Sequence, residues 1–337
     1  MKSAFVTGAT GFVGLNLVEE LVRQGWQVTA LHRVESDLAE LGRFPVTLMP
    51  GDITDAASLR AAMPEDVDAV FHVAGNTNLW SRRNARQTRE NVEGTRNAVE
   101  AARARGAKKL VLTSSIAAYG QQSGELTEAT KSNAKKSWIN YQRTKWLAEE
   151  EVRKGIRAGL PATILNPGAI IGRYDTGGWA RLFHLVAQDR LPGALPGEVS
   201  AAHVGEVVKA HVAAAERGKI GENYILAGTR TSFAEMLGII AELLGKPPPK
   251  RILKPGLLRI IARVQVMRAA ITGKPPQLTP ESVALSTRTI SCPSLKARHE
   301  LGFQIVPVKT MLQDCYDWLV ATGRLKVSHD GQTTDQG

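Results

Sequence analysis

The chain has 337 residues, 43% of them hydrophobic and 22% charged, which is enough apolar material for one large or two modest globular domains. Its formal charge is +11 at pH 7 and its pI is about 9.8. This basic balance alone selects neither nucleic acid nor a membrane surface nor an anionic ligand. Because the sequence has no zinc-ligand spacing, no aromatic RNA-binding motif and no basic tail, we expect no nucleic-acid partner and no metal site.

Cysteine content and the start of the chain bear on location. Cys292 and Cys315 are too few for a disulfide framework. A strand-like segment starts at residue 2, which leaves no room for a signal peptide, and no long uncharged apolar stretch follows. We therefore expect a cytoplasmic protein, and a homodimer is compatible with the sequence.

The first element predicted is a strand at residues 2–7, followed at once by glycines and then by helical periodicity over residues 15–25. Gly8 allows a sharp turn, Gly11 lets backbone amides approach a pyrophosphate, and Gly14 lets the helix lie close to the sheet. The spacing is G-x-x-G-x-x-G instead of G-x-G-x-x-G, but the strand, turn and helix are the setting of a dinucleotide site. The cofactor-binding residues predicted in this turn are Gly8, Thr10, Gly11, Phe12, Val13 and Gly14.

The second predicted strand, residues 27–32, determines the choice of cofactor. NAD-binding folds place an acidic side chain at the end of this strand to accept the ribose hydroxyls, whereas this chain reads Leu31-His32-Arg33-Val34. Arg33 can make a bidentate contact with a 2′-phosphate. We therefore predict NADP in preference to NAD, the alternative being that Arg33 is an ordinary exposed arginine.

Strand-like segments then alternate with helices along the chain. The segments at 46–50, 68–74, 108–115, 161–166 and 222–228 are predicted strands, and 89–106, 138–155 and 203–218 are predicted helices. This alternation predicts an α/β protein with a Rossmann-type doubly wound parallel sheet and a smaller C-terminal substrate-binding domain. We expect the nucleotide-binding domain at 1–170 plus about 201–228, the substrate domain at 171–200 and 229–326, and a disordered tail at 327–337.

Within the predicted helix at 138–155, Tyr141 and Lys145 are four residues apart and therefore share a face. An ammonium beside the phenol would stabilise its anion and lower its pKa, which makes Tyr141 a candidate general acid or base. Taken alone, such a pair is more often packing plus a solvated charge. Its position downstream of the glycine turn favours the catalytic interpretation.

Taken in order, six motifs make the chain resemble an extended short-chain dehydrogenase/reductase of the NAD-dependent epimerase/dehydratase family. The resemblance covers Met1 to about Leu325, and within the family it is stronger to the dihydroflavonol-reductase-like branch, through HVAGNTNLW and GENYILAGTRTSFAEMLGIIAELLGKPPP. The six motifs are TGATGFVG, GDITD, VFHVAG, TSSIAAYG, YQRTK and LNPGAIIG.

This resemblance implies roles for further residues. Ser115 would hydrogen-bond the substrate oxygen, Tyr141 would exchange a proton with it, and Lys145 would hold the nicotinamide ribose. Ser115 in TSS can equally end a strand, and Asp52 can equally cap a helix beginning near Ala56. The other cofactor contacts implied are Asp52, Ile53, Ala74, Gly75, Thr113, Pro167, Gly168, Ala169 and Ile170.

The resemblance also narrows the reaction. Nucleotide-sugar dehydratases have Thr-Asp-Glu where this chain has Ser115-Ile116-Ala117, and isoleucine and alanine can serve as neither acid nor base. Epimerisation needs clamps for a nucleotide diphosphate, for which the candidates are Asn166, Arg173, Arg181 and Arg190, although surface arginines are the commoner explanation. An apolar or aromatic ketone suits the candidate substrate residues better, and these are Asn78, Leu79, Trp80, Trp138, Trp179 and Phe183. Trp80 and Trp138 can equally belong to the core.

One basic segment stands apart. Residues 243–280 contain no acidic residue, and their lysines and arginines alternate with apolar residues. Such a helix can lie on an anionic bilayer surface. We favour the alternative, a helix of the substrate domain whose apolar face packs inward and whose arginines point to water.

The sequence thus predicts an NADP(H)-dependent oxidoreductase that reduces a ketone or aldehyde, or oxidises the alcohol, with Tyr141 as general acid or base. The first alternative is a nucleotide-sugar epimerase with tightly bound NAD. The second is a non-catalytic dinucleotide-sensing protein, which the presence of Ser115, Tyr141 and Lys145 together disfavours.

Overall fold

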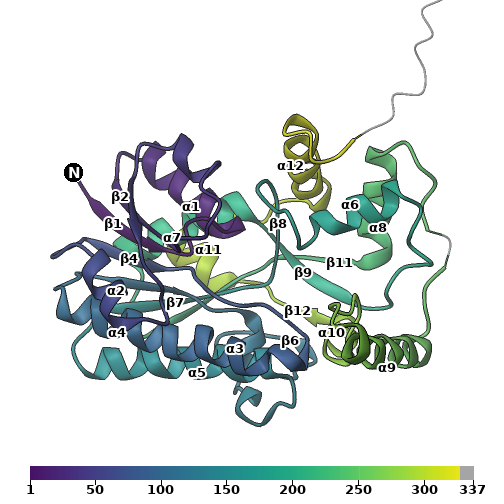
Figure 1. Cartoon of the computed structure of the whole chain (residues 1–337), viewed down its shortest axis with the longest axis horizontal. Helices are drawn as coiled ribbons and strands as arrows, with labels where there is room; N and C mark the ends of the chain where they lie inside the picture. Colours follow the sequence, from purple (N-terminus) through teal and green to yellow (C-terminus); the bar gives the residue numbers. More distant parts are fainter. Residues whose placement is uncertain (250, 327–337) are drawn as a thin grey trace, which may run out of the picture.

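The computed structural model describes residues 1–249 and 251–326, so the expected disordered tail at 327–337 lies outside the described residues. Seven parallel strands form the main sheet in the order β10-β7-β5-β4-β1-β2-β3 (Figure 1). This order reverses direction between β1 and β4, which confirms the predicted doubly wound α/β fold. The strands are β1 Ser3–Thr7, β2 Gln27–His32, β3 Thr47–Pro50, β4 Ala69–His72, β5 Leu110–Thr113, β7 Ala162–Pro167 and β10 Asn223–Leu226.

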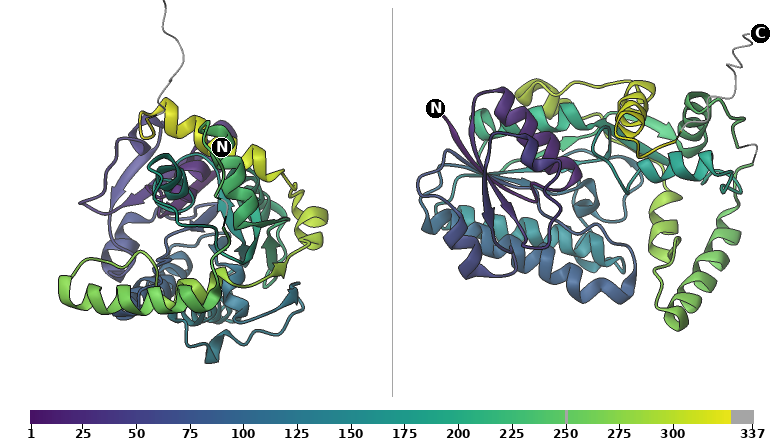
Figure 2. Two further views of the ribbon diagram at one scale, coloured as in Figure 1. Left: turned by 90° about the vertical axis from the view of Figure 1, so that its right-hand side faces the viewer. Right: turned by 45° about the horizontal axis from the view of Figure 1, so that its top comes forward.

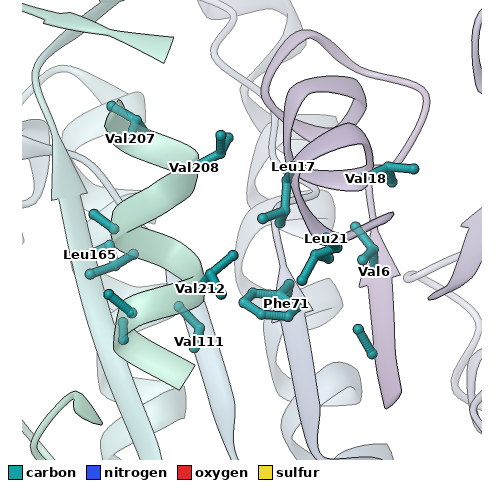
Figure 3. Close-up of a cluster of buried hydrophobic side chains, with 14 of the residues drawn as sticks. Val6, Leu17, Val18, Leu21, Phe71, Val111, Leu165, Val207, Val208 and Val212 are labelled. Carbon is teal, nitrogen blue, oxygen red and sulfur yellow. The ribbon is translucent and has the colours of Figure 1, made fainter. Parts of the chain in front are cut away.

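Helices cover both faces of the main sheet. On one face α1 (Phe12–Arg23) and α7 (Val204–Arg217) lie side by side, and Figure 3 shows Leu17 and Leu21 of α1 and Val212 of α7 gathered around Phe71 of β4. On the other face lie α2 (Ala56–Ala62), α4 (Gly94–Ala104) and α5 (Asn140–Arg157). Because both faces are covered, the strands are almost continuously buried and read as apolar runs.

The helix expected at 89–106 has a different construction. It begins earlier, as α3 (Asn84–Thr88), passes through a π-helical turn at Arg89–Glu93, and continues as α4. The π turn rotates Asn91 into the protein, where it is buried. Such turns are frequent at functional sites, and periodicity alone does not reveal them.

A second sheet was not expected from the sequence. It has the order β11-β9-β8, formed by Thr229–Ser232, Glu198–His203 and Ala169–Ile171, and a short pair joins β6 (Gly124–Glu125) to β12 (Ile290–Ser291). Strands β9, β11 and β12 fall largely within the expected substrate domain, 171–200 and 229–326. These strands have two to six residues and little apolar alternation, so the sequence gives no strong signal for them.

The two larger sheets are joined by direct chain crossings. β7 runs into β8 through Gly168, whose amide donates to the Leu226 carbonyl. A Cβ on Gly168 would lie 2.8 Å from the Ala227 Cβ, so this crossing requires glycine. β10 leads to β11 after only two residues, which gives a second crossing beside the first.

Around the small sheet, α6 (Ala180–Ala187), α8 (Phe233–Leu243) and α12 (Val308–Ala321) share a separate apolar core. α9 (Pro255–Thr272) and α10 (Pro280–Ser286) form an arm that stands out from this half (Figure 2). α11 (Leu295–Leu301) returns to the main sheet and packs beside α7 and β10. Among the described residues, no helix is both long enough and apolar enough to cross a bilayer.

Candidate functional site

The site is a cleft of about 1430 Å³ that begins at the carboxyl ends of β1 and β4, where the strand order reverses. Open α/β sheets bind their ligands at such a switch point. The cleft continues between the main sheet and the small sheet with its helices. Every cofactor-binding residue predicted from the sequence lines this cleft.

The glycine turn between β1 and α1 is shaped by close backbone approach. Gly8 has φ +71°, and a Cβ there would lie 2.7 Å from the Ala74 backbone. A Cβ on Gly14 would collide with the Gly8 carbonyl. α1 begins after Gly11 without a side-chain cap, so its first amides and the positive end of its dipole face the cleft. These features fit the pyrophosphate of a dinucleotide.

Directly after β2, Arg33 lines the cleft beside His32 and Ser36. Its Nε lies 3.4 Å from Glu35 Oε1, but the Glu35 side chain is 72% exposed and does not line the cleft. A carboxylate is thus available two residues after Arg33, although the segment Leu31-His32-Arg33-Val34 contains none. An exposed pair of this kind is weak, so Arg33 can still contact an anion.

Asp52 is not the cap of the following helix, since Asp55 accepts from the Ala57 and Ser58 amides at the start of α2. Asp52 Oδ1 instead accepts from the amide and hydroxyl of Thr54, at 2.7 and 2.8 Å, and the residue lines the cleft. The helix-cap alternative for Asp52 is therefore excluded, and the residue fits an adenosine contact.

Ser115, Tyr141 and Lys145 all line the cleft; Ser115 lies two residues after β5, and the other two belong to α5. The side chains of Ser115 and Tyr141 lie beside each other, and Ser115 Oγ accepts from the Ala117 amide at 3.1 Å. Lys145 Nζ donates to the Thr113 carbonyl at 3.0 Å and lies close to Gly75. A side chain at Gly75 would therefore displace the ammonium.

The pKa of the Tyr141 phenol differs in direction from the expectation. Burial raises it, and the opposing hydrogen bond from Ser115 does not compensate. Tyr141 is therefore a protonated donor at neutral pH in this arrangement. That Lys145 lowers the tyrosine pKa stays a prediction.

Burial also lowers the pKa of Lys145, to about 8, while the charge of Glu149 opposes this shift. Glu149 lies one turn further along α5 and is itself buried. The lysine is therefore a cation at neutral pH and loses its charge in mildly alkaline solution.

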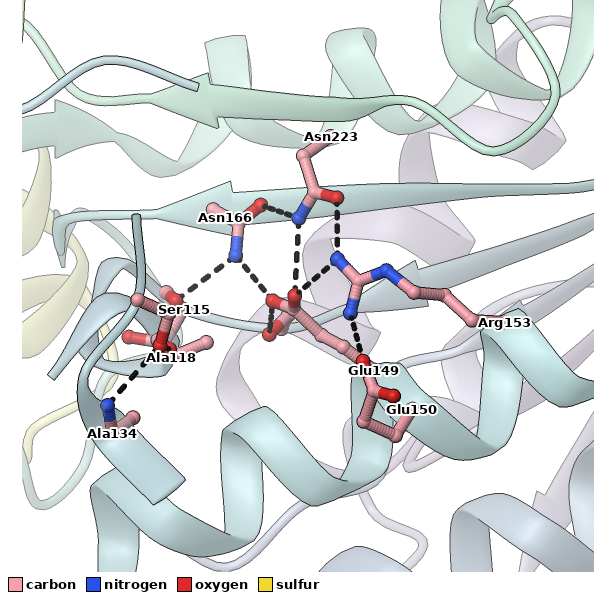
Figure 4. A network of polar contacts seen from close by, with 10 residues as sticks. Ser115, Ala118, Ala134, Glu149, Glu150, Arg153, Asn166 and Asn223 are labelled. Carbon is pink, nitrogen blue, oxygen red and sulfur yellow. Dashed lines mark hydrogen bonds and ion pairs between the residues drawn. The ribbon is translucent and has the colours of Figure 1, made fainter. Parts of the chain in front are cut away.

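Glu149 belongs to a polar network that the sequence did not predict (Figure 4). Its carboxylate accepts from Ser114 Oγ at 2.6 Å, from Asn166 Nδ2 at 2.6 Å and from Arg153 at 3.0 Å. Asn166 Nδ2 also donates to the Ser115 carbonyl at 3.0 Å. Asn166 is thus occupied in holding Ser115 and does not line the cleft, which corrects its candidate role as a diphosphate clamp.

Asn91 is a second residue that the sequence did not single out. Its side chain accepts from the Asn76 amide at 2.7 Å and donates to Thr144 Oγ1 at 3.0 Å. It therefore joins the loop after β4 to α5, and so fixes Gly75 relative to Lys145. The π turn that directs Asn91 inward is visible only in the structure, so the sequence periodicity gave no signal for this residue.

The candidate substrate residues divide into two groups. Asn78, Leu79 and Trp179 line the cleft. Trp80 is instead buried, with Arg82 and Arg83 over its ring, Trp138 is 55% exposed on the surface, and Phe183 is buried in the core of α6 and α8. Proposed cleft roles for these three are therefore wrong.

Of the candidate anion clamps, Arg181 and Arg190 line the cleft, whereas Arg173 lies outside it and pairs with Glu19 at 3.0 Å. The structure adds Arg288, whose Nη1 donates to the Gly120 carbonyl at 3.2 Å while Nη2 is buried without a partner among the described residues. Burial lowers its pKa. The described residues contain no group of His, Cys, Asp and Glu side chains placed to hold a metal ion.

Comparison with known proteins agrees with this geometry. Residues 4–227 match the NAD dependent epimerase/dehydratase family. Over 333 residues the chain is 32% identical to a putative dihydroflavonol 4-reductase of Synechocystis sp., with 96% of each chain covered. Over 328 residues it is 30% identical to sterol demethylase protein B of Methylococcus capsulatus, covering 96% of this chain and 100% of that one.

Solved structures show the same fold. The crystal structure of gox2253 has a TM-score of 0.83 and 32% identity, covering 97% of this chain and 100% of that one. UDP-glucuronic acid 4-epimerase from Bacillus cereus in complex with NAD has a TM-score of 0.74 at 19% identity, with coverage of 95% and 99%. The chain therefore belongs to the NAD-dependent epimerase/dehydratase family and is an enzyme of the extended short-chain dehydrogenase/reductase type.

Proposed function

We propose that the protein is an NADP(H)-dependent carbonyl reductase, or alcohol dehydrogenase, for an apolar substrate. The observation that carries this proposal is the lining of the cleft beyond Ser115 and Tyr141. Apolar side chains dominate there and come from both halves of the protein; they are Leu79, Trp179, Leu182, Leu185, Leu191, Leu195, Val199, Phe233, Leu237, Leu253, Leu258, Ile261, Leu278 and Leu285. A surface of this kind favours an apolar ligand.

The names of several relatives support a carbonyl substrate. One is a putative dihydroflavonol 4-reductase and another is a cinnamoyl-CoA reductase of Oryza sativa, 28% identical over 268 residues. A third, from Stigmatella aurantiaca and 28% identical over 306 residues, is a ketoreductase of a farnesyl-substituted quinoline oxide. These names concern substrates that combine a carbonyl group with apolar or aromatic parts.

The chain's own residues account for the proton side of such a reduction. A bound dihydronicotinamide supplies the hydride. The Ser115 hydroxyl can donate a hydrogen bond to the substrate oxygen, and Tyr141 can transfer its proton to that oxygen as the alcohol forms. Burial keeps Tyr141 protonated at neutral pH, so the phenol can donate a proton at that pH, as reduction of a carbonyl requires. Oxidation of the alcohol needs the phenolate and should accelerate as the pH rises.

A cofactor-consumption assay tests the proposal. We expect the purified protein to oxidise NADPH stoichiometrically in the presence of apolar or aromatic ketones, and to form the corresponding alcohols. UDP-sugars should give no product. Interconversion of UDP-sugar isomers without net loss of NADPH absorbance would contradict the reductase proposal and favour an epimerase.

The preference for NADP rests on Arg33, with Ser36 beside it in the cleft. We predict that Arg33→Asp lowers NADPH affinity about 10- to 100-fold, the size of a charge-assisted contact, and leaves NADH affinity nearly unchanged. Titration calorimetry measures both. As a control, Glu35→Gln removes the carboxylate that competes for Arg33 and should tighten NADPH binding. An unchanged NADPH:NADH affinity ratio in Arg33→Asp would refute the assignment.

A nucleotide-sugar epimerase is the second candidate, and Arg288 is the observation that favours it. A buried guanidinium with an unpartnered Nη2 in the cleft suits a phosphate or carboxylate, and Arg181 and Arg190 line the same cleft. Retention of NAD through purification, with UDP-sugar turnover that Arg288→Gln abolishes, would identify this activity.

A further inference from the structure

The outer face of α9 carries an unusual row of exposed apolar side chains. Leu257, Ile260, Val264, Met267 and Ile271 follow one another at intervals of three and four residues, so they form one stripe along the helix. Between 49% and 88% of each is exposed. α9 belongs to the arm that stands out from the body (Figure 2), which leaves this stripe open to solvent.

A different face of the same helix holds it in place. Leu258, Ala262 and Ala269 are buried, and Leu258 and Ala262 pack with Val283 of α10. The expectation that the apolar face of this segment packs inward is therefore incomplete, because α9 has apolar side chains on two opposite faces. The stripe is not needed for this packing, and exposed apolar surfaces of this extent mark interaction sites.

The surroundings of the stripe are basic. On an ideal helix, Arg259 and Arg263 lie on one side of it and Arg268 on the other, and all three are exposed. None of them forms an ion pair with another residue that the structure describes. The sequence from 243 to 280 contains no aspartate or glutamate, so nothing within it offsets these charges.

We propose that the α9 stripe docks on the surface of an anionic phospholipid bilayer. A helix lying in the interface plane buries an apolar face among the acyl chains and places flanking arginines at the phosphate level, which is the pattern of this stripe. A second copy of the chain fits less well, because stripe-to-stripe contact would bring two acid-free basic segments together. The proposal concerns attachment only and does not depend on the reaction that the cleft performs.

Vesicle sedimentation tests the proposal with the full chain. We expect partitioning onto phosphatidylcholine vesicles with about one third phosphatidylglycerol to be at least about tenfold stronger than onto pure phosphatidylcholine vesicles. Ile260→Ser/Val264→Ser and, separately, Arg259→Glu/Arg263→Glu should each remove most of this binding. All four side chains are exposed, so the variants should keep the parent melting temperature.

Matched controls lie elsewhere on the surface. Ile220→Ser removes another exposed isoleucine, and Lys131→Glu/Lys136→Glu makes the same change in net charge. Both controls should bind anionic vesicles like the parent. Equal loss in the controls, full binding by Ile260→Ser/Val264→Ser, or no vesicle binding by the parent would each overturn the proposal. So would a parent dimer that Ile260→Ser/Val264→Ser converts to a monomer in light scattering without any vesicle binding, since the stripe would then contact a second copy.

Discussion

Replacing Tyr141 by phenylalanine is expected to lower turnover about 10²- to 10⁴-fold, the contribution of a positioned general acid. The change removes the hydroxyl that lies beside the Ser115 side chain and leaves the ring at the cleft wall. Cofactor affinity and the melting temperature should remain close to those of the parent. Steady-state kinetics on a substrate identified by NADPH consumption would measure the loss in kcat.

Tyr119 provides the matched control. Burial also raises the pKa of this phenol, but its side chain lies in the core beside Leu126 and does not line the cleft. Tyr119→Phe should therefore keep the parent kcat. If Tyr141→Phe retained most of its activity, or if the two variants lost equal activity, Tyr141 would not be the proton donor.

Replacing Lys145 by methionine is expected to impair both cofactor binding and turnover. The buried ammonium lies between the Thr113 carbonyl and Gly75, where the family resemblance places the nicotinamide ribose. A charge-assisted hydrogen bond is worth about 1.5–3 kcal/mol, so we expect NADPH affinity to fall about 10- to 100-fold, with a further loss in kcat. Calorimetry and kinetics together separate the two losses.

The same variant should change the pH dependence of stability. Burial lowers the pKa of Lys145 from 10.5 to about 8, so between these values the unfolded chain binds more protons than the folded one. This group therefore makes the parent more stable as the pH rises from 8 to 10.5, by about 3 kcal/mol in all. Lys145→Met should lack that rise in stability with pH. Loss of the hydrogen bond to Thr113 also changes the stability of the variant, but by an amount that does not depend on pH. Chemical denaturation of parent and variant at several pH values would show it.

A variant of Lys109 is the control that distinguishes the catalytic role of Lys145 from the general effect of removing a buried lysine. Its Nζ is also buried, donates to the Gly218 carbonyl at 2.6 Å, and has a pKa lowered by burial, but it does not line the cleft. Lys109→Met should alter stability while leaving kcat and NADPH affinity unchanged. Parallel losses of activity in both lysine variants would indicate a general structural effect and remove the specific role of Lys145.

The main sheet was predictable because its strands carry a strong local signal. Each is an apolar run between helices. Each observed strand lies inside the expected segment or extends one residue past it. The small sheet gave no such signal. β8 follows β7 after one glycine and β11 has the sequence TRTS, so their pairing depends on tertiary contacts that local propensity does not contain.

Within the site, the residues that belong to local sequence motifs line one cleft, as the sequence predicted. Examples are Gly8, Arg33 and Tyr141. The direction of the Tyr141 pKa was not predictable, because spacing gives the shared helix face but not how deeply the phenol is buried. The substrate residues were no more predictable. Tryptophan suits a pocket, a core or a surface equally well, and only packing distinguishes Trp179 from Trp138.

The paired crossings at Gly168 and after β10 restrict how the enzyme can open. Bending the two halves apart would deform two neighbouring crossings at once, together with the hydrogen bond between Gly168 and Leu226. The α9–α10 arm is held to the body in a different way: Thr279 Oγ1 donates to the Leu79 carbonyl at 2.8 Å, and Leu195 packs against the cluster of Leu258, Ala262 and Val283. The two crossings therefore keep the main sheet and the small sheet, and with them the two walls of the cleft, in a fixed relation.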